Sequence, residues 1–470
     1  MPTAVIAGGS VAGLATALAL GTAGYRVLVL ERDPAPPEGD LAQTAETWHR
    51  PSAPQASHSH NLTGLGVRTL SAHAPQVLDA VLAVGAELLD LTAAMPAGAS
   101  HRDRRAGDEE LVALGCRRTT LELALYRAVR DVPGVDIRHR TVVRGLLLDD
   151  RARATGIVAD DGRSLAADAV IDATGRRCAS RNWLKAAGVP TAEDRLHPSG
   201  LAVYTRFYRR RRSGGRPGPL NRGNAAGGIW DHYAGFVHLG DDATHSVVLT
   251  ALPGDPVAQA LRHTAVFTAA ARATPWLAAW ADAGEPLTPV RALSCPPTVL
   301  RGAATGGPAA IAGLYHVGDA ACVTNPLFGR GMSLALAHAF ALGGLLAERF
   351  PDDPGLGSAA ARCTLRLMKP WYEHSVRADN ERSAHWRVSA APPAVSRGPA
   401  RQLVPAQAGT AQRDGLVWRD LMRMLMTLAP HDEDRSGPLW HSRPHTPGTQ
   451  EPPAPTRHSF AQLLTAAGGG

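Results

Sequence analysis

Short apolar runs and helical repeats alternate along the first part of the chain. Thr3–Ala7 (TAVIA) and Arg26–Leu30 (RVLVL) have the length of strands, and a helical pattern from Leu14 to Gly24 separates them. A further run, Ala169–Gly175, begins as an apolar strand and ends in small turn residues. Continuous apolar runs of this kind are typical of strands buried on both faces, and their alternation with helices indicates a parallel sheet. The sequence therefore predicts an α/β fold with a Rossmann-type core.

The pattern changes between residues 200 and 251. Three longer stretches, LAVYTRFY, GGIWDHYAGFVHL and HSVVLTAL, alternate polar and apolar residues and carry several aromatic side chains. This alternation predicts an antiparallel sheet that forms a second unit. A strand pattern returns at 310–319, and a Gly-rich turn at 325–332 leads into a helix through Phe350. A last helix near 412–428 is expected either as a docked core helix or as a channel lid or membrane-surface contact.

The residues between the first two strands form a candidate dinucleotide site. Gly8 permits a tight turn, Gly13 allows close packing of helix and strand, and the helix N-terminus offers N–H groups to a pyrophosphate. Glu31 ends the second strand, 18 residues beyond Gly13, where an acid can bind a ribose hydroxyl. Ser10 stands where this motif has its middle glycine. The pattern predicts dinucleotide binding, with a purely structural turn as the alternative.

Composition excludes several classes of protein. Hydrophobic residues make up 44% and charged residues 19%, which is enough for a large core. The net charge is +7 and aromatic residues reach only 5%, so nucleic-acid binding is not expected. No apolar run approaches the roughly 18 residues of a transmembrane segment. Five cysteines without a C-x-x-C pattern, in a chain that starts directly in a strand, favour a cytoplasmic protein without a metal site.

Four longer blocks of sequence follow one another along the chain. They are VIAGGSVAGL…VLVLER, CRRTTLELAL, AVIDATGRRCASRNWL and HVGDAACVTNPLFGRGMSLALAHAFAL. Together they resemble FAD-dependent monooxygenases of the p-hydroxybenzoate-hydroxylase superfamily. The last two blocks, and the segment PQASHSH, are most similar to bacterial enzymes related to squalene epoxidase and to the polyene epoxidases of polyether biosynthesis. The resemblance spans about residues 3–390.

The resemblance implies an α/β fold in which a Rossmann-type FAD-binding domain carries an inserted antiparallel-sheet substrate domain and a C-terminal helical region. The expected segments are an FAD-binding domain at 1–195 with substrate-side segments at 62–115, a substrate domain at 196–295, a return to the FAD-binding domain at 296–350, a helical region at 351–430 and a flexible Pro-rich tail at 431–470. We expect the aromatic residues of the inserted sheet to roof the flavin.

The family motif can be carried over residue by residue. The cofactor-binding residues implied are Gly8, Ser10, Ala12, Gly13, Glu31, Arg32, Arg118, Val143, Thr174, Gly175, Asp319, Gly331 and Met332. Among them, Asp319 matches the acid that holds the ribityl chain, and Gly331 with Met332 would begin a helix aimed at the flavin ring. The A-T-G at 173–175 departs from the Asp-Gly that the aromatic hydroxylases usually carry. No catalytic residue is assigned, and His58, His60 and Asn325 are the candidates.

The function implied is oxygen insertion into an apolar natural-product intermediate, by epoxidation or hydroxylation, through a flavin C4a-hydroperoxide. The substrates are then an apolar small molecule and O2, with NAD(P)H or a separate flavin reductase as the electron source. A dehydrogenase or desaturase on the same scaffold is the alternative. A flavin halogenase fits less well because no W-x-W-x-I-P segment is present, and a non-enzymatic flavoprotein remains open. Arg209–Arg212 is expected as a solvated loop or as the docking site of a carrier protein.

Overall fold

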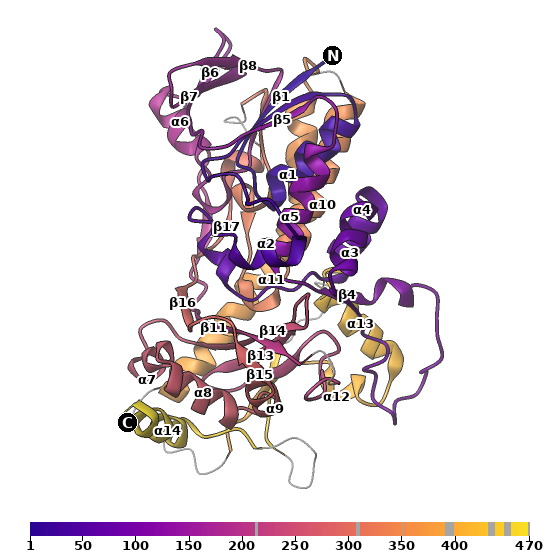
Figure 1. Ribbon diagram of the computed structural model, residues 1–470, viewed down its shortest axis with the longest axis vertical. Coiled ribbons are helices and arrows are strands. Elements are labelled where there is room, and N and C mark those ends of the chain that lie inside the picture. The colour runs from indigo at the N-terminus through magenta and orange to yellow at the C-terminus, as the bar shows by residue number, and fades with distance from the viewer. Residues whose placement is uncertain are drawn as a thin grey trace.

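The computed structural model describes residues 1–211, 215–306, 311–349, 351–390, 399–430, 438–445 and 453–468. Its upper half in Figure 1 is built on five parallel strands in the order β18–β9–β1–β2–β5. Their bounds are β1 Thr3–Ala7, β2 Arg26–Leu30, β5 Val135–Arg138, β9 Ala169–Asp172 and β18 Leu314–His316. This is the parallel Rossmann-type core that the apolar runs predict.

Both faces of this sheet are covered, which is why its strands are apolar throughout. One face carries the helices α1 Val11–Thr22, α5 Arg118–Arg130 and α10 Gly331–Glu348. The other carries α6 Ser180–Ala186 and the antiparallel strands β6 Val143–Leu148, β7 Ala154–Ala159 and β8 Ser164–Ala166. Successive strand residues point to opposite faces, so Ile6 and Val29 pack under the helices while Val5 and Val170 pack under the small sheet.

The lower half holds the predicted antiparallel sheet (Figure 1). Its strand order is β12–β13–β14–β11–β15, and β16 also pairs with β11. Their bounds are β11 Ala202–Arg210, β12 Ala226–Ile229, β13 Ala234–Leu239, β14 Thr244–Ala251, β15 Gly284–Pro286 and β16 Arg291–Ser294. One face packs against α7 Pro256–Gln259, α8 Thr264–Ala273, α9 Ala278–Asp282 and α14 Arg457–Gly468. The opposite face packs in part against α11 Leu356–Ala390, β20 Gln402–Pro405 and β21 Trp440–Arg443 and in part borders a cavity.

A 35-residue helix, α11 Leu356–Ala390, joins the two halves. Met368 and Trp371 in its first half pack in a cluster with Leu334 of α10, while Ala378 and Trp386 pack against residues of the antiparallel sheet. Figure 1 shows it between the two sheets. Both sheets are therefore fixed relative to one helix.

Smaller elements complete the structure. They are α2 Leu41–Thr47, α3 Gly64–His73, α4 Pro75–Ala83, α12 Ala408–Ala411, α13 Gly415–Leu425, and the strands β3 Glu87–Asp90, β4 Val112–Gly115, β10 Arg195–His197, β17 Thr298–Leu300, β19 Cys322–Val323, β20 Gln402–Pro405 and β21 Trp440–Arg443.

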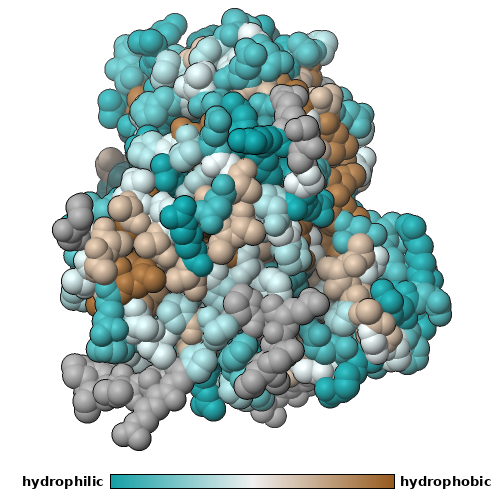
Figure 2. Space-filling model, turned by 60° about the horizontal axis from the view of Figure 1, so that its bottom comes forward, coloured by the Kyte–Doolittle hydropathy of each residue, from teal (hydrophilic) through white to brown (hydrophobic). Residues whose placement is uncertain are grey.

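Of the described helices, α10 alone has the length and hydropathy to cross a membrane, and 61% of it is buried against the protein, as in a core helix. The face drawn in Figure 2 is mainly hydrophilic, with its apolar residues in separate areas.

Two expectations differ from the structure. In the predicted flexible tail, β21 pairs with β20, and α14 buries Phe460 and Leu464 against the α8 layer. These described parts of the tail are packed because their apolar residues complete a core of the lower half. The arginine run also does not begin in a loop, since Arg209 and Arg210 end β11 and form ion pairs with Glu46 and Glu87. The last residue of that run lies outside the described residues.

Candidate functional site

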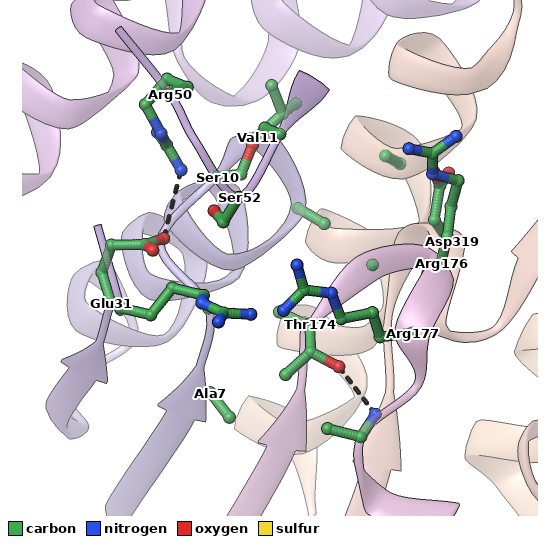
Figure 3. A pocket seen from close by; sticks show the side chains of 18 of the residues that line it. Ala7, Ser10, Val11, Glu31, Arg50, Ser52, Thr174, Arg176, Arg177 and Asp319 are labelled. Carbon is green, nitrogen blue, oxygen red and sulfur yellow. Dashed lines mark hydrogen bonds and ion pairs between the residues drawn. The ribbon is translucent and has the colours of Figure 1, made fainter. Parts of the chain in front are cut away.

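A cavity of about 260 Å³ opens at the carboxyl ends of β1, β2 and β9, where α1 and α10 both begin. Figure 3 shows Glu31 with Arg50 on one side of it and Asp319 with Arg176 on the other. The predicted residues that line it are Gly8, Ser10, Ala12, Glu31, Arg32, Arg118, Val143, Thr174, Gly175, Asp319, Gly331 and Met332. In parallel α/β sheets, ligands bind at this edge. We refer to this space as the first cavity.

The Gly-rich turn brings backbone to the floor of the first cavity. Gly8 adopts a φ of +107°, and a Cβ there would lie 2.5 Å from the carbonyl oxygen of Ala173. Gly13 lies behind the turn, where a Cβ would lie 1.9 Å from the carbonyl oxygen of Gly8. The Ser10 side chain does not cap α1, so the first turn of the helix keeps N–H groups for a ligand.

Ser10 has a role that a glycine could not fill. Its hydroxyl donates to the Glu122 carboxylate at 2.9 Å and accepts from the Arg118 guanidinium at 3.1 Å. Arg118 begins α5 and also pairs with Glu122 at 3.4 Å. The serine therefore holds the Arg118 side chain at the cavity wall, beside the N-terminus of α1.

Arg50 is a central residue of this site that sequence reasoning missed. Its guanidinium is buried and pairs with Glu31 at 3.2 Å, with Asp33 at 3.0 Å and with Glu122. Burial opposes its charge, but the three carboxylates raise the pKa of Arg50 above its ordinary value. The Glu31 carboxylate also accepts a 2.8 Å hydrogen bond from the backbone N–H of Gly9. This network fixes the carboxylate at the end of β2.

Asp319 offers an unsatisfied carboxylate to the first cavity. It lies just after β18 in a 3-10 turn, and no described residue donates a hydrogen bond to its side chain. Burial raises its pKa, and the charges of Arg118 and Arg176 act in the opposite direction. Asp319 is half-buried at the cavity wall, so its carboxylate is placed to accept from a hydroxyl of a bound molecule.

A buried cluster stabilises the turn at 173–175 from below. Oxygen, sulfur and nitrogen atoms of Asp172, Cys178 and His316 lie within 4.8 Å of one another. The Asp172 carboxylate already accepts from the Thr174 backbone N–H at 2.9 Å and from the Thr174 hydroxyl at 2.6 Å. Burial raises the pKa of the Cys178 thiol to about 12, and Ser180 bonds to the His316 ring at 2.9 Å. The hydrogen bonds give this cluster a structural role rather than that of a metal site.

A second cavity of about 130 Å³ lies against the face of the antiparallel sheet that is opposite α8 and α14. Its walls include Leu201, Val203, Ile229, Phe236, Val248, Leu293, Phe328 and Trp440. The end of α13 contributes Leu425 and Met426, while Trp418 and Leu421 of the same helix are buried in the lower core. The helix is therefore docked and also borders the cavity. Gln55 lines both cavities, so they are direct neighbours.

Most of the aromatic residues that we expected to cover the flavin lie elsewhere in the structure. Tyr204, Trp230 and Tyr233 pack in the core on the side of the helices α8 and α14. The aromatic residues expected there are Tyr204, Phe207, Trp230, Tyr233 and Phe236, and of these Phe236 alone lines the second cavity. Tyr204 follows the wall residue Val203 on β11, so the alternation of side chains turns it to the other face of the sheet. Phe207 shares a face with Val203 but does not line the cavity.

The catalytic candidates separate into two groups. His58 and His60 line the second cavity, where the His58 ring bonds to the Thr205 hydroxyl at 3.0 Å and the His60 ring to the His58 carbonyl at 2.9 Å. Asn325 does not line either cavity. Its side chain accepts from the backbone N–H of Leu327 at 2.7 Å and donates to Asp379 at 2.5 Å, which orders the turn before α10.

These histidines make stability depend on pH. Burial is the main cause that lowers the pKa of His58 to about 4, of His60 to about 3 and of His238 to about 4, from an ordinary value of 6.5. Below pH 6.5 these histidines bind protons in the unfolded chain but not yet in the folded one. The free energy of unfolding that they contribute above pH 6.5 is therefore lost as the pH falls towards 4. Urea unfolding at pH 7, 6 and 5 is expected to show a steeper loss in the wild type than in His238→Gln. The exposed-residue control His385→Gln should follow the wild type, and parallel curves for all three would contradict the assignment.

Sequence likeness to a known protein covers part of the chain. No protein-family model matches the chain. Protein Rv3254 of Mycobacterium tuberculosis is 29% identical over 198 residues, which are 38% of this chain and 39% of that protein. The match thus spans about two fifths of that relative.

Solved structures extend the likeness over most of the chain. The structure of PqsL, described as a probable FAD-dependent monooxygenase from Pseudomonas aeruginosa, matches with a TM-score of 0.61 and 15% identity over 82% of this chain and 98% of PqsL. The fold is that of FAD-dependent monooxygenases. The Diels-Alderase PyrE3 of pyrroindomycin biosynthesis matches with a TM-score of 0.59 and 17% identity over 91% of this chain and 81% of PyrE3. The expected fold class is confirmed, while function has to be argued from the site.

Proposed function

We propose that this protein is an FAD-dependent monooxygenase that acts on an apolar small molecule. The observation that carries the proposal is the pair of neighbouring cavities, one built from the dinucleotide motif and the other mainly apolar, which share Gln55. A cofactor in the first cavity would lie next to a substrate in the second. The oxygen-inserting relatives of this fold, and the epoxidase-like sequence blocks, favour epoxidation or hydroxylation over dehydrogenation.

The residues of the first cavity fit FAD. The turn from Gly8 to Gly13 and the uncapped start of α1 would bind the pyrophosphate, and Glu31 the adenosine ribose. Asp319 accepts no hydrogen bond from the described residues and would accept from the ribityl hydroxyls. Gly331 begins α10 without a capping side chain, so its end of the helix would favour negative charge on the flavin ring.

Bound FAD, once reduced, would supply two electrons that activate O2, so that one oxygen atom enters the substrate and the other leaves as water. The chain contributes binding, orientation and exclusion of water from the reacting atoms. Apolar side chains such as Val203, Phe236 and Val248 would limit the water around a bound substrate in the second cavity. His58 and His60 would line it as neutral hydrogen-bonding groups, since their pKa values lie near 4 and 3. We further propose that NAD(P)H or a separate flavin reductase supplies the electrons.

Cofactor identity is the first test. The purified protein, reconstituted with flavin, is expected to bind FAD in preference to FMN, because a full dinucleotide reaches from Glu31 to Asp319. Replacement Glu31→Ala removes charged hydrogen bonds and should weaken FAD binding by ~1–3 kcal/mol. Absorbance titration measures both, and release of FMN, or no bound flavin, would refute the proposal.

Oxygen transfer is the second test. Candidate apolar substrates are incubated with the FAD-loaded protein, NADH or NADPH and a flavin reductase under ¹⁸O2. One labelled oxygen atom is expected in the product, detected by mass spectrometry. Oxidised product without label, with hydrogen peroxide as the only fate of O2, would replace the monooxygenase with a dehydrogenase or desaturase.

A further inference from the structure

Arg222 is a cation in the wall of the second cavity that no carboxylate accompanies. It lies between β11 and β12, is half-buried, and forms no ion pair with any residue in the described part of the chain. Five buried arginines, Arg50, Arg117, Arg301, Arg382 and Arg419, each pair with an acidic side chain. The buried Arg330 instead lies against the rings of Phe328 and Trp371 and does not line the second cavity. A charged side chain without a counter-ion in an apolar wall destabilises the fold unless a ligand of opposite charge pairs with it.

The position of Arg222 is well defined. Its backbone N–H donates to the Ala225 carbonyl at 3.0 Å, and the neighbouring Asn221 side chain exchanges two hydrogen bonds with Gly227 of β12. The Arg222 guanidinium carbon lies 5.2 Å from the centroid of the Phe236 ring. A guanidinium carries five N–H donors, and contact with a ring does not use them as a hydrogen bond would, so two of them can bind a carboxylate.

The electrostatics of the cavity point to a single negative charge. Arg222 is the charged residue among the described residues that line it, and burial lowers its pKa to about 10, so it stays protonated at neutral pH. Burial and the Arg222 charge hold the pKa of His238 at about 4, so that histidine is neutral and adds no second cation. A doubly charged phosphate would lack a second counter-ion, whereas one carboxylate is balanced.

We propose that the substrate of the second cavity is an apolar molecule with one carboxylate group, and that Arg222 binds this carboxylate. The inference rests on the proposed function, because it assigns a substrate class to the same site. Arg222 would then fix which carbon of the apolar part faces the first cavity. Selectivity follows from the same contact, since an uncharged analogue would leave the guanidinium buried without a partner.

The test measures binding on the FAD-loaded protein, without turnover. Three acids, 2-naphthoate, 4-phenylbutyrate and decanoate, are each compared with their uncharged primary amide by isothermal titration calorimetry at pH 7.5. We expect at least one acid to bind about tenfold or more tightly than its amide. This preference should disappear in Arg222→Met and Arg222→Gln, persist in Arg222→Lys, and be unchanged in Arg144→Met, a control at an exposed arginine of β6.

The FAD content of every sample is recorded by absorbance, which separates this inference from the proposed function. Protein without FAD refutes the proposed cofactor, whatever the acids do. Protein with FAD that binds acid and amide equally, or binds neither, overturns the carboxylate assignment alone. The same conclusion follows if the preference survives in Arg222→Gln. If Arg222→Met does not bind FAD, the acid preference of the wild type, Arg222→Gln and Arg222→Lys still tests whether Arg222 binds the carboxylate.

Discussion

The variant Gly13→Ala is expected to lose FAD binding although it adds a single methyl group. The new Cβ would lie 1.9 Å from the carbonyl oxygen of Gly8, closer than any non-bonded contact, and 3.3 Å from the Ala173 side chain. Both neighbours belong to the floor of the first cavity, so relief of the overlap has to move α1 away from the turn. The N–H groups at the start of α1 then leave the position in which they would bind pyrophosphate.

The flavin absorbance of reconstituted protein measures this effect, and circular dichroism reports whether the fold survives. Gly344→Ala is the matched control, because Gly344 is exposed on α10 and no atom lies within 4 Å of its added Cβ. That control should keep FAD and gain about 0.5–1 kcal/mol from the higher helix propensity of alanine. A Gly13→Ala protein with wild-type FAD affinity would show that the turn is not part of the cofactor site.

The variant Arg50→Met should be destabilised by about 3–5 kcal/mol, which is typical of a buried charge left without its partner. Removal of the guanidinium leaves Glu31, Asp33 and Glu122 close together, buried and without their common cation. Their repulsion would also displace the Glu31 carboxylate. Loss of FAD is therefore expected together with the loss of stability.

Urea unfolding of the flavin-free protein gives the stability change, and an absorbance titration gives the change in FAD affinity. Arg138→Met is the control, because Arg138 forms a solvent-exposed ion pair with Asp136 at 3.2 Å. Such pairs contribute about 0–1 kcal/mol, so the control should unfold close to the wild type. Equal unfolding curves for the two variants would contradict the central role of Arg50.

The local pattern of the sequence was sufficient for the fold class. Apolar runs at Thr3–Ala7 and Arg26–Leu30 predicted β1 and β2, and the alternating stretches after residue 200 predicted the antiparallel sheet. Strand and helix periodicity are local properties, so they can be found in one sequence. Gly8 and Gly13 could be singled out for the same reason, since a turn and its spacing are local. Their binding of FAD stays a prediction.

The tail and the aromatic residues show where local pattern was insufficient. Proline-rich composition favoured a flexible tail, yet Phe460 and Leu464 are buried, because α14 meets an apolar face supplied by α8. Aromatic residues on strands were expected at the flavin, yet Trp230 and Tyr233 pack in the opposite core. Which face of a strand borders a cavity depends on what packs against the sheet, and that is not contained in the strand itself.

The sequence by itself determined the parallel core, the inserted antiparallel sheet and the glycine turn, because each follows from short-range periodicity and the steric freedom of glycine. Only the tertiary structure decided the electrostatics of the site. Arg50 meets Glu31 and Glu122 across long sequence separations, and Arg222 meets no acid in the described part of the chain. The energy of a charge depends on its burial and on the charges around it, and both are set by which distant segments fold together.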